Sequence, residues 1–249
     1  MSGLHSFELA ATDGKLIRGD RAMGKNHQVL FITGFLSKRW GNKSKALAQW
    51  CQEQGWGFCC YDVRGFGDSE GTFTDYTLSD WIADARSVLT LLKDGPPATI
   101  VGNSLGSWIA WLMAQEFEFV DRLILIAPAF NMMGLRAKQI SPEGLKAWQS
   151  TGWMPWDDDP LHKDWPLSWK WVEESEAYWQ ATFDRLRPVQ TTILHGLQDT
   201  VILPDGSREF ARLLLAKAPT YPIDLNLIPG DHRLSSPEHV ERFHKLVLG

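Results

Sequence analysis

A serine, an aspartate and a histidine occur in the chain order expected when the nucleophile stands at a turn from a parallel strand to a helix. Ser104 lies at the centre of Gly-Asn-Ser-Leu-Gly, residues 102–106, between a β-branched run and an apolar helical pattern. A serine hydroxyl is a weak nucleophile at neutral pH, so it needs a histidine base that a carboxylate orients. Asp199 and His232 each follow a later apolar run. The pattern predicts a catalytic triad of Ser104, Asp199 and His232.

Short apolar runs alternate with longer helical patterns along the chain, which is typical of βαβ units. After a hairpin that turns at Asp13 and Gly14, strands are expected within residues 28–34, 57–63, 98–104, 121–130, 191–199 and 223–230. Helices are expected within residues 44–55, 76–95, 105–117, 205–218 and 237–248. The predicted fold class is therefore α/β, with a mostly parallel central sheet flanked by helices. The triad would converge at the carboxyl edge of that sheet.

The two glycines around Ser104 have a predicted steric role. In a sharp turn from strand to helix, side chains at Gly102 and Gly106 would collide with the neighbouring strand and helix. Ser104 would stand at a helix N-terminus, where free amides favour negative charge. We expect the amides of Leu105 and Phe35 to form an oxyanion hole, although several amides in residues 34–38 could supply the second donor.

Other acidic and histidine residues near the strand ends are expected to have simpler roles. Asp205 would cap the helix that it opens, and Asp231 is adjacent to His232 and so poorly aimed at its ring. His195 ends a predicted strand, where a structural hydrogen bond is expected. Solvated or packing roles are expected for the remaining histidines: His5, His27, His162, His239 and His244.

Residues 131–185 break the regular alternation. They contain seven of the thirteen tryptophans, mixed with prolines and acidic residues. We interpret them as a helical insertion, or cap, in a core made of residues 1–130 and 186–249. Aromatic side chains bury much area and often line ligand clefts. The sequence leaves open whether these tryptophans line a pocket or only pack the insertion onto the core.

The charge and hydropathy patterns exclude two partner classes. The formal net charge is −5 and lysines and arginines do not cluster, which argues against a nucleic-acid partner. The most apolar stretch, residues 123–133, is interrupted by Pro128 and Asn131 and falls short of the ~18 residues of a membrane span. The first residues lack the pattern of a targeting segment. We expect a cytoplasmic protein without stable membrane insertion, and the oligomeric state stays open.

No metal or organic cofactor is expected. Cys59 and Cys60 are adjacent and would point to opposite faces of a strand, so these and Cys51 are predicted to be buried, reduced thiols. The three aspartates at residues 157–159 are interpreted as a solvated loop. Residues 65–67 lack the third glycine of a dinucleotide fingerprint.

The motifs together resemble the α/β-hydrolase superfamily over essentially the whole chain. Residues 61–71, Tyr-Asp-Val-Arg-Gly-Phe-Gly-Asp-Ser-Glu-Gly, are similar to a structural turn that often precedes the nucleophile in that superfamily. More narrowly, residues 34–37, 45–51, 102–108, 194–202 and 231–235 resemble the abhydrolase-domain group of palmitoyl-protein thioesterase and acyl-glucuronide esterase. The resemblance implies a serine hydrolase without a cofactor, with Ser104, Asp199 and His232 as its triad.

The predicted function is hydrolysis of a carboxylic ester or thioester with an apolar or aromatic acyl group. Two alternatives remain, because a fold does not fix its chemistry. The same triad could cleave a C–C or peptide bond or serve a lyase. A non-catalytic member of the fold could bind a small molecule without turnover, although it would not need all three triad residues.

Overall fold

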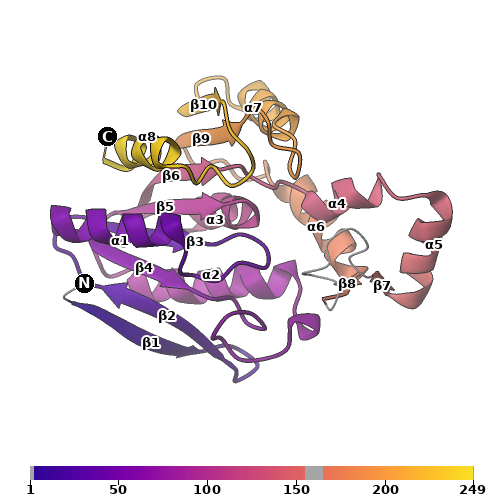
Figure 1. Ribbon diagram of the computed structural model, residues 1–249, viewed down its shortest axis with the longest axis horizontal. Coiled ribbons are helices and arrows are strands. Elements are labelled where there is room, and N and C mark those ends of the chain that lie inside the picture. Colours follow the sequence, from indigo (N-terminus) through magenta and orange to yellow (C-terminus); the bar gives the residue numbers. More distant parts are fainter. Residues whose placement is uncertain (1–2, 155–164, 249) are drawn as a thin grey trace.

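The computed structural model describes residues 3–154 and 165–248, which form a mixed sheet between two layers of helices (Figure 1). The sheet has the strand order β1-β2-β4-β3-β5-β6-β9-β10. β1 (Leu4–Ala10) and β2 (Leu16–Ala22) form the predicted antiparallel hairpin, and β2 also pairs antiparallel with β4 (Gly57–Tyr61). The remaining strands are parallel to β4: β3 (Gln28–Ile32), β5 (Ala98–Asn103), β6 (Val120–Ile126), β9 (Gln190–Gly196) and β10 (Ile223–Ile228).

Each face of the sheet packs against its own helices. α1 (Asn42–Gln54) and α8 (Pro237–Leu248) cover one face, and α2 (Leu78–Leu92), α3 (Leu105–Glu116) and α7 (Asp205–Lys217) cover the other (Figure 1). Successive side chains of a strand point to opposite faces. Ile100 of β5 accordingly packs on the α2 and α3 side, whereas Val101 packs on the α1 and α8 side. This double covering explains why the parallel strands read as continuous apolar runs.

The cysteines behave as their positions predict. Cys59 and Cys60 of β4 are both buried, and they belong to the apolar clusters on opposite faces of the sheet. All three cysteines are free thiols. Burial raises the pKa of Cys51 and of Cys59 to about 12, so these thiols stay protonated at neutral pH.

A capping box formed by Thr77 and Asp80 opens α2. The Asp80 carboxylate accepts a hydrogen bond from the Thr77 amide at 2.9 Å. The apolar side of the helix, including Trp81 and Leu89, is buried against the sheet. A short 3-10 turn, η1 (Phe73–Asp75), leads into this helix.

The insertion, residues 131–185, contains the predicted helices and one feature that was not predicted. The helices are α4 (Met132–Ala137), α5 (Pro142–Thr151) and α6 (Lys170–Ala181). Two short strands, β7 (Trp153–Met154) and β8 (Leu167–Ser168), pair antiparallel. Two-residue strands are too short to show an alternating pattern in sequence. The predicted loop at residues 157–159 and His162 lie outside the described residues, and the division at residues 130 and 186 stays a prediction.

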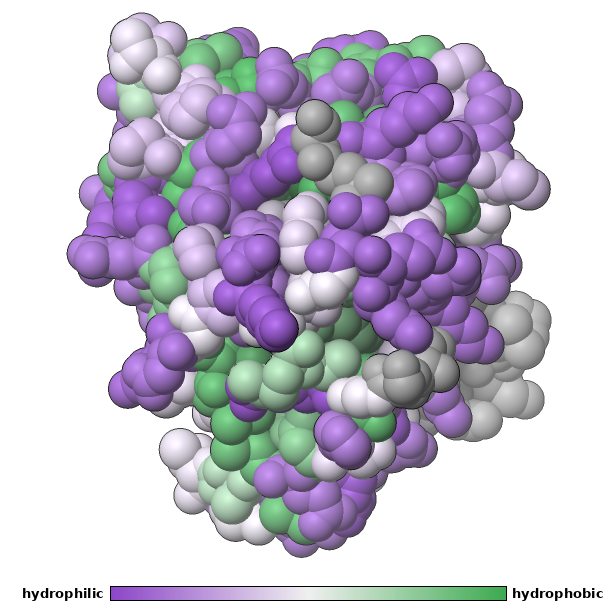
Figure 2. All heavy atoms as spheres, turned by 90° about the vertical axis from the view of Figure 1, so that its left-hand side faces the viewer, coloured by the Kyte–Doolittle hydropathy of each residue, from purple (hydrophilic) through white to green (hydrophobic). Residues whose placement is uncertain are grey.

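The insertion lies at the carboxyl edge of the parallel strands, on the right of Figure 1. Figure 2 shows the opposite end of the molecule, where hydrophilic side chains predominate and apolar ones gather in the lower part. Within the described parts of the chain, the helices are too short or too polar to cross a membrane.

Candidate active site

Ser104 occupies the sharp turn between β5 and α3. Its backbone has φ 53° and ψ −120°, a conformation that a residue with a side chain rarely adopts. Two backbone hydrogen bonds hold it there: the Ser104 amide donates to the Ile126 carbonyl at 2.8 Å, and the Ala129 amide donates to the Ser104 carbonyl at 3.1 Å. Both partners come from β6 and the residues directly after it. The neighbouring strand therefore stabilises the strained turn.

The two motif glycines are required by close backbone approach, as predicted. A Cβ atom at Gly106 would lie 2.3 Å from the carbonyl oxygens of Ile32 and Thr33, at the end of β3. A Cβ atom at Gly102 would lie 2.4 Å from the Cα atom of Ser107 in α3. Neither contact could be relieved by rotating a side chain, because the crowded atoms belong to the backbone. The glycines let β3, β5 and α3 meet closely enough to form the turn.

The structure brings the three predicted triad residues together. His232, in the loop between β10 and α8, places Nε2 at 3.1 Å from the Ser104 hydroxyl oxygen. Its Nδ1 lies 2.7 Å from Oδ2 of Asp199, in the loop between β9 and α7. An ionised carboxylate can only accept hydrogen bonds, so Nδ1 carries the proton and Nε2 is left to accept the serine proton. This arrangement can activate Ser104 as a nucleophile.

Asp199 is held in its charged form by four donors. Its side chain is buried, and Oδ1 accepts the amides of Val201 and Ile202 at 2.9 and 2.8 Å. Oδ2 faces His195 at 3.0 Å as well as His232. Burial alone would raise the pKa of Asp199, but the hydrogen bonds from His195, His232 and Ile202 outweigh it and hold this pKa well below its ordinary value.

His195 has a larger role than a structural hydrogen bond at a strand end. The ring is fully buried, and Nε2 faces two acceptors, Oδ2 of Asp199 at 3.0 Å and the Ile202 carbonyl at 2.9 Å. Nε2 therefore carries the proton, and Nδ1 accepts from the Ser207 hydroxyl at 2.8 Å. His195 orients the acid from the side opposite His232. The only signal in sequence was a histidine four residues before the predicted acid.

The other acidic candidates lie outside the triad. Asp231 accepts the amides of Arg233 and Leu234 at 3.1 and 3.0 Å, which shapes the loop that carries His232. Asp205 was predicted to cap α7, and this prediction was wrong: Pro204 occupies the cap position, and Asp205 is the first helical residue. Its exposed carboxylate pairs with Arg208, one turn along the helix.

Three histidines outside the triad region have structural partners, and His5 lies exposed on β1. Nε2 of His27 lies 2.8 Å from the Thr99 hydroxyl, and burial lowers the pKa of His27. His239 contacts the Ser236 hydroxyl at 2.8 Å. The ring of His244 stacks on Trp50 with a centroid distance of 4.1 Å. These contacts and the exposure of His5 agree with the predicted solvated or packing roles.

The two predicted oxyanion donors lie in the expected elements. Leu105 is the first residue of α3, where an amide has no acceptor within the helix. Phe35 follows Gly34, and a Cβ atom built on Gly34 would lie 3.1 Å from Cβ of Ser104, so this loop passes directly beside the nucleophile. The Phe35 ring packs edge-on against Trp171 of the insertion. The assignment of both amides as oxyanion donors stays a prediction.

A buried charge cluster anchors the loop that carries Phe35. Oδ1 of Asp62, directly after β4, accepts the Arg39 amide at 2.6 Å, and its Oδ2 pairs with the Arg39 guanidinium. Oδ2 of Asp62 also accepts the Asp68 amide at 3.0 Å. Nearby, Arg64 pairs with the fully buried Asp84 of α2 at 2.6 Å. Residues 61–71 thus connect the loop after β3 to the core, which agrees with the structural role predicted for this turn.

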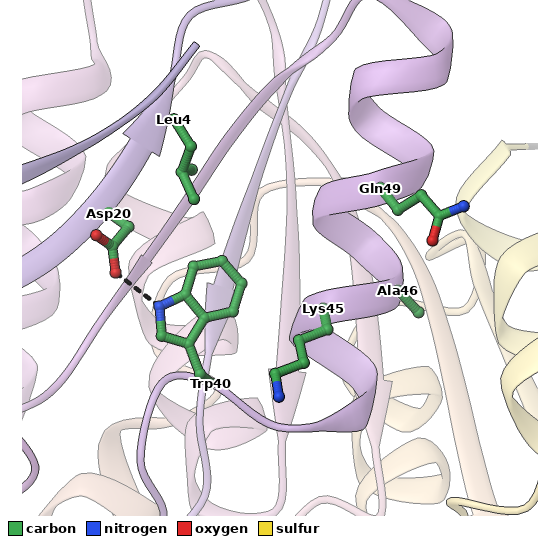
Figure 3. Close-up of a pocket in the computed structure, with 6 residues that line it drawn as sticks. All are labelled: Leu4, Asp20, Trp40, Lys45, Ala46 and Gln49. Atoms are coloured by element: carbon green, nitrogen blue, oxygen red, sulfur yellow. Dashed lines mark hydrogen bonds between the residues drawn. The ribbon is translucent and has the colours of Figure 1, made fainter. Parts of the chain in front are cut away.

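Two hollows differ in their relation to the triad. One, of about 540 Å³, lies between α4 and α7 and is bordered by Val201 and Ile202, whose amides bind Asp199. The other lies between the β1–β2 hairpin and α1 (Figure 3). Its carboxylate, Asp20, already accepts the Trp40 indole and the Arg39 guanidinium, both at 2.7 Å. Only the first hollow adjoins the candidate active site.

The described parts of the chain contain no cluster of three or more histidine, cysteine or acidic side chains that could hold a metal ion. The absence of a cofactor stays a prediction. The arrangement of Ser104, His232 and Asp199 is in itself suited to nucleophilic chemistry, because it supplies a nucleophile, a base and an orienting carboxylate.

Comparisons with known proteins identify the family of the chain. The human mitochondrial palmitoyl-protein thioesterase ABHD10 is 28% identical over 88% of this chain and 71% of that protein. Its bovine counterpart is 27% identical over 73% of this chain and 60% of that protein. The structure of mouse alpha/beta hydrolase domain-containing protein 10 matches with a TM-score of 0.85 at 23% identity, over 98% of this chain and 96% of that one. The structure of Est1E from Butyrivibrio proteoclasticus with bound ferulic acid matches with a TM-score of 0.75 at 22% identity, over 97% of this chain and 96% of that one. Residues 29–247 match the model of the alpha/beta hydrolase family, and the chain therefore belongs to that family.

Proposed function

We propose that this hydrolase is a serine acyl hydrolase that cleaves a carboxylic ester or thioester. The proposal rests above all on the continuous hydrogen bonding from Ser104 through His232 to Asp199. The relatives named as palmitoyl-protein thioesterases support the same reaction class. Such a triad is recognised by its geometry and by the role of each member.

In the proposed mechanism, the Ser104 oxygen attacks the substrate carbonyl carbon while Nε2 of His232 takes the hydroxyl proton. His232 then returns this proton to the departing alcohol or thiol, which leaves an acyl-enzyme. Water attacks the acyl carbonyl, again with His232 as the base, and releases the carboxylic acid. Asp199 stays ionised throughout and stabilises the imidazolium that forms in each half of the cycle.

The amides of Leu105 and Phe35 are proposed to bind the oxyanion of the tetrahedral intermediates. Leu105 begins a helix whose N-terminal partial charge favours an anion. Backbone donors in a partly buried site need no reorganisation when the charge develops, which lowers the barrier of both steps.

The proposed acyl group is apolar or aromatic. Some tryptophans of the insertion pack internally: Trp148 and Trp171 are buried, and their indoles donate to the carbonyls of Leu167 and Tyr76 at 2.9 and 3.2 Å. Trp179 of α6 instead borders the hollow between α4 and α7. The tryptophans therefore divide between packing and lining a cavity, and the lining supports an apolar ligand.

Replacing the nucleophile tests this function. The wild-type protein and the Ser104→Ala variant would be mixed with p-nitrophenyl esters of graded chain length and with a palmitoyl thioester. We expect kcat of the variant to fall by about 10⁴-fold or more, because no other group takes the place of the hydroxyl. Release of p-nitrophenol or of the thiol is the measurement.

Ser107→Ala is the matched control. Ser107 lies one turn further along α3, is buried, and donates its hydroxyl to the Ile126 carbonyl at 3.1 Å, away from His232. This variant should keep turnover within about tenfold of wild type, since it loses only one buried hydrogen bond. Equal turnover by wild type and Ser104→Ala, or none by wild type, would contradict the proposal and favour C–C or peptide cleavage, a lyase, or ligand binding.

A further inference from the structure

The loops that carry the acid and the base of the triad leave neighbouring strands. β9 leads to Asp199, and β10, the last strand of the sheet, leads to His232 (Figure 1). The pairing of these strands continues past their ends, because the Leu197 amide donates to the Ile228 carbonyl at 2.7 Å. The two loops therefore start from one continuous ladder, and contacts beyond it decide how far the base lies from the acid.

Gln198 and Gly230 form a reciprocal contact beyond that ladder. The Gln198 amide donates to the Gly230 carbonyl at 2.9 Å, and the Gly230 amide donates to Oε1 of the Gln198 side chain at 2.5 Å. Gln198 directly precedes Asp199, and Gly230 lies two residues before His232. The two hydrogen bonds thus close a small ring that also contains the hydrogen bond between Asp199 and His232.

Glycines allow the two loops to approach each other at this point. A Cβ atom at Gly196, the last residue of β9, would lie 2.3 Å from the Gly230 carbonyl oxygen and 2.6 Å from that of Asp231. Gly230 has φ 146°, a conformation that residues with side chains rarely adopt. In this conformation both the carbonyl and the amide of Gly230 bond to Gln198. The local backbone is therefore shaped around the glutamine.

Other side chains hold the loop of the base to helices rather than to the acid. Lys43 of α1 donates to the Arg233 carbonyl. Nε2 of His239, in α8, lies 2.8 Å from the Pro229 carbonyl oxygen. These contacts position the loop relative to the helices on one face of the sheet. Gln198 differs because it belongs to the loop of the acid itself, so its contact acts directly on the separation of acid and base.

We propose that Gln198 is a positioning residue that fixes the separation of the His232 ring from the Asp199 carboxylate. This inference rests on the proposed acyl-hydrolase function and adds a residue that governs its base. Nδ1 of His232 lies 2.7 Å from Oδ2 of Asp199, and a displacement of about 1 Å at such a site can lower a rate by about 10²-fold. A ring that moves away from the carboxylate also loses the charge that balances the imidazolium.

The exposure of Gln198 separates its effect on position from its effect on stability. Gln198 lies at the surface, so water can accept the hydrogen bond of the Gly230 amide when the glutamine oxygen is removed. A variant should therefore stay nearly as stable as wild type. Water does not connect the Gly230 amide to the loop of the acid, and the spacing of acid and base is then no longer fixed.

Two substitutions of similar length test the glutamine oxygen. Gln198→Met keeps the length of the side chain but has no strong acceptor, whereas Gln198→Glu keeps an acceptor oxygen. With p-nitrophenyl acetate, the acetyl ester, kcat of Gln198→Met should fall about tenfold while KM stays within about twofold, because positioning acts on proton transfer rather than on substrate binding. Gln198→Glu should keep kcat within about threefold of wild type.

A proton resonance reports the spacing directly. The Nδ1 proton of His232, which the Asp199 carboxylate accepts, resonates far downfield in a ¹H NMR spectrum, and His232→Gln identifies it by its absence. A longer hydrogen bond moves this resonance upfield or exposes the proton to exchange with water. We expect the wild-type resonance in Gln198→Glu, and a shifted or missing one in Gln198→Met. A role in stability alone would leave it in place.

Gln49→Met is the matched control. Gln49 is an exposed glutamine of α1 whose amide donates to Glu53, one turn along the same helix, at 2.9 Å. The same substitution at this position should leave both kcat and the resonance unchanged. If Gln198→Met did not fold, Gln198→Asn would replace it, because its side chain is one methylene shorter and leaves the Gly230 amide out of reach.

The outcomes separate this inference from the proposed function. When wild type hydrolyses the acetyl ester, an unchanged kcat or an unchanged resonance in Gln198→Met would overturn the positioning role and leave the hydrolase function standing. A loss of the same size in Gln198→Glu would also overturn it, since the acceptor oxygen would not be what matters. Absence of turnover of every ester by wild type would overturn the proposed function, and the resonance alone would then decide whether Gln198 sets the spacing.

Discussion

The turn at Ser104 and the insertion meet at the same edge of the sheet but are held by different forces. The turn depends on backbone hydrogen bonds to β6 and on glycines that let β3 and α3 approach β5. The insertion is attached through side chains. The Trp171 indole donates to the Tyr76 carbonyl at 3.2 Å, and the Glu174 carboxylate accepts the Thr77 hydroxyl and the Ser79 amide at 2.9 and 2.8 Å.

Because of this difference, the position of Ser104 and the choice of substrate depend on different parts of the molecule. Backbone geometry in the sheet fixes the nucleophile and does not depend on the insertion's side chains. The insertion forms one wall of the hollow between α4 and α7, and Trp171 packs on the loop that carries Phe35. Changes in the insertion can therefore alter which substrate fits while the triad geometry persists.

The largest effect is expected at the acid. Asp199→Asn should lower kcat by roughly 10⁴-fold, because an amide at this position can stabilise the wrong tautomer of His232 and carries no charge to balance the imidazolium. His195→Gln removes one donor from the same carboxylate and should cost only about ten- to hundredfold. Steady-state kinetics on the acetyl ester measures both. Equal losses would mean that His195, and not the charge of Asp199, sets the orientation of the base.

A smaller effect is expected on stability at the turn. Gly106→Ala should lower the free energy of unfolding by about 3 kcal/mol, because its Cβ would lie 2.3 Å from the Ile32 and Thr33 carbonyl oxygens. Urea denaturation measures this, with activity assayed alongside. Gly206→Ala is the control, since its Cβ meets open space within a helix and should stabilise by about 0.5–1 kcal/mol. An unchanged stability of Gly106→Ala would show that the backbone can relax around the turn.

The smallest effect is expected in the insertion. Trp171→Phe keeps an aromatic ring but leaves the buried Tyr76 carbonyl without the indole donor, which should cost about 1–3 kcal/mol of stability. Hydrolysis of the acetyl ester should stay within about tenfold of wild type, because the triad has no contact with this indole. Trp153→Phe, at a residue 42% exposed, should change stability by less than about 0.5 kcal/mol. A loss of acetyl-ester activity as large as that of Asp199→Asn would contradict the separation of the two regions.

Chain order and strand ends were enough to predict that the three proposed triad residues would meet. Ser104, Asp199 and His232 each follow a recognisable apolar run, and parallel strands place such residues at one edge. The role of His195 could not be predicted in full, because its two acceptors are brought together only by the tight loop after β9. The cap of α7 was misassigned because the hydrogen bonds of a helix start one residue earlier than the acidic signal suggested.

The sequence by itself determined the order of the elements and the placement of Ser104, Asp199 and His232 at strand ends. These depend on local periodicity and on residues that fall within or directly after single strands. Only the tertiary structure decided how Asp199 is held and which segments border the hollow between α4 and α7. That hollow is built from segments around residues 128–139, 179 and 201–213. Their contact depends on the packing of the insertion against α7, and the physical reason is that long-range packing leaves no periodic signal in any one segment.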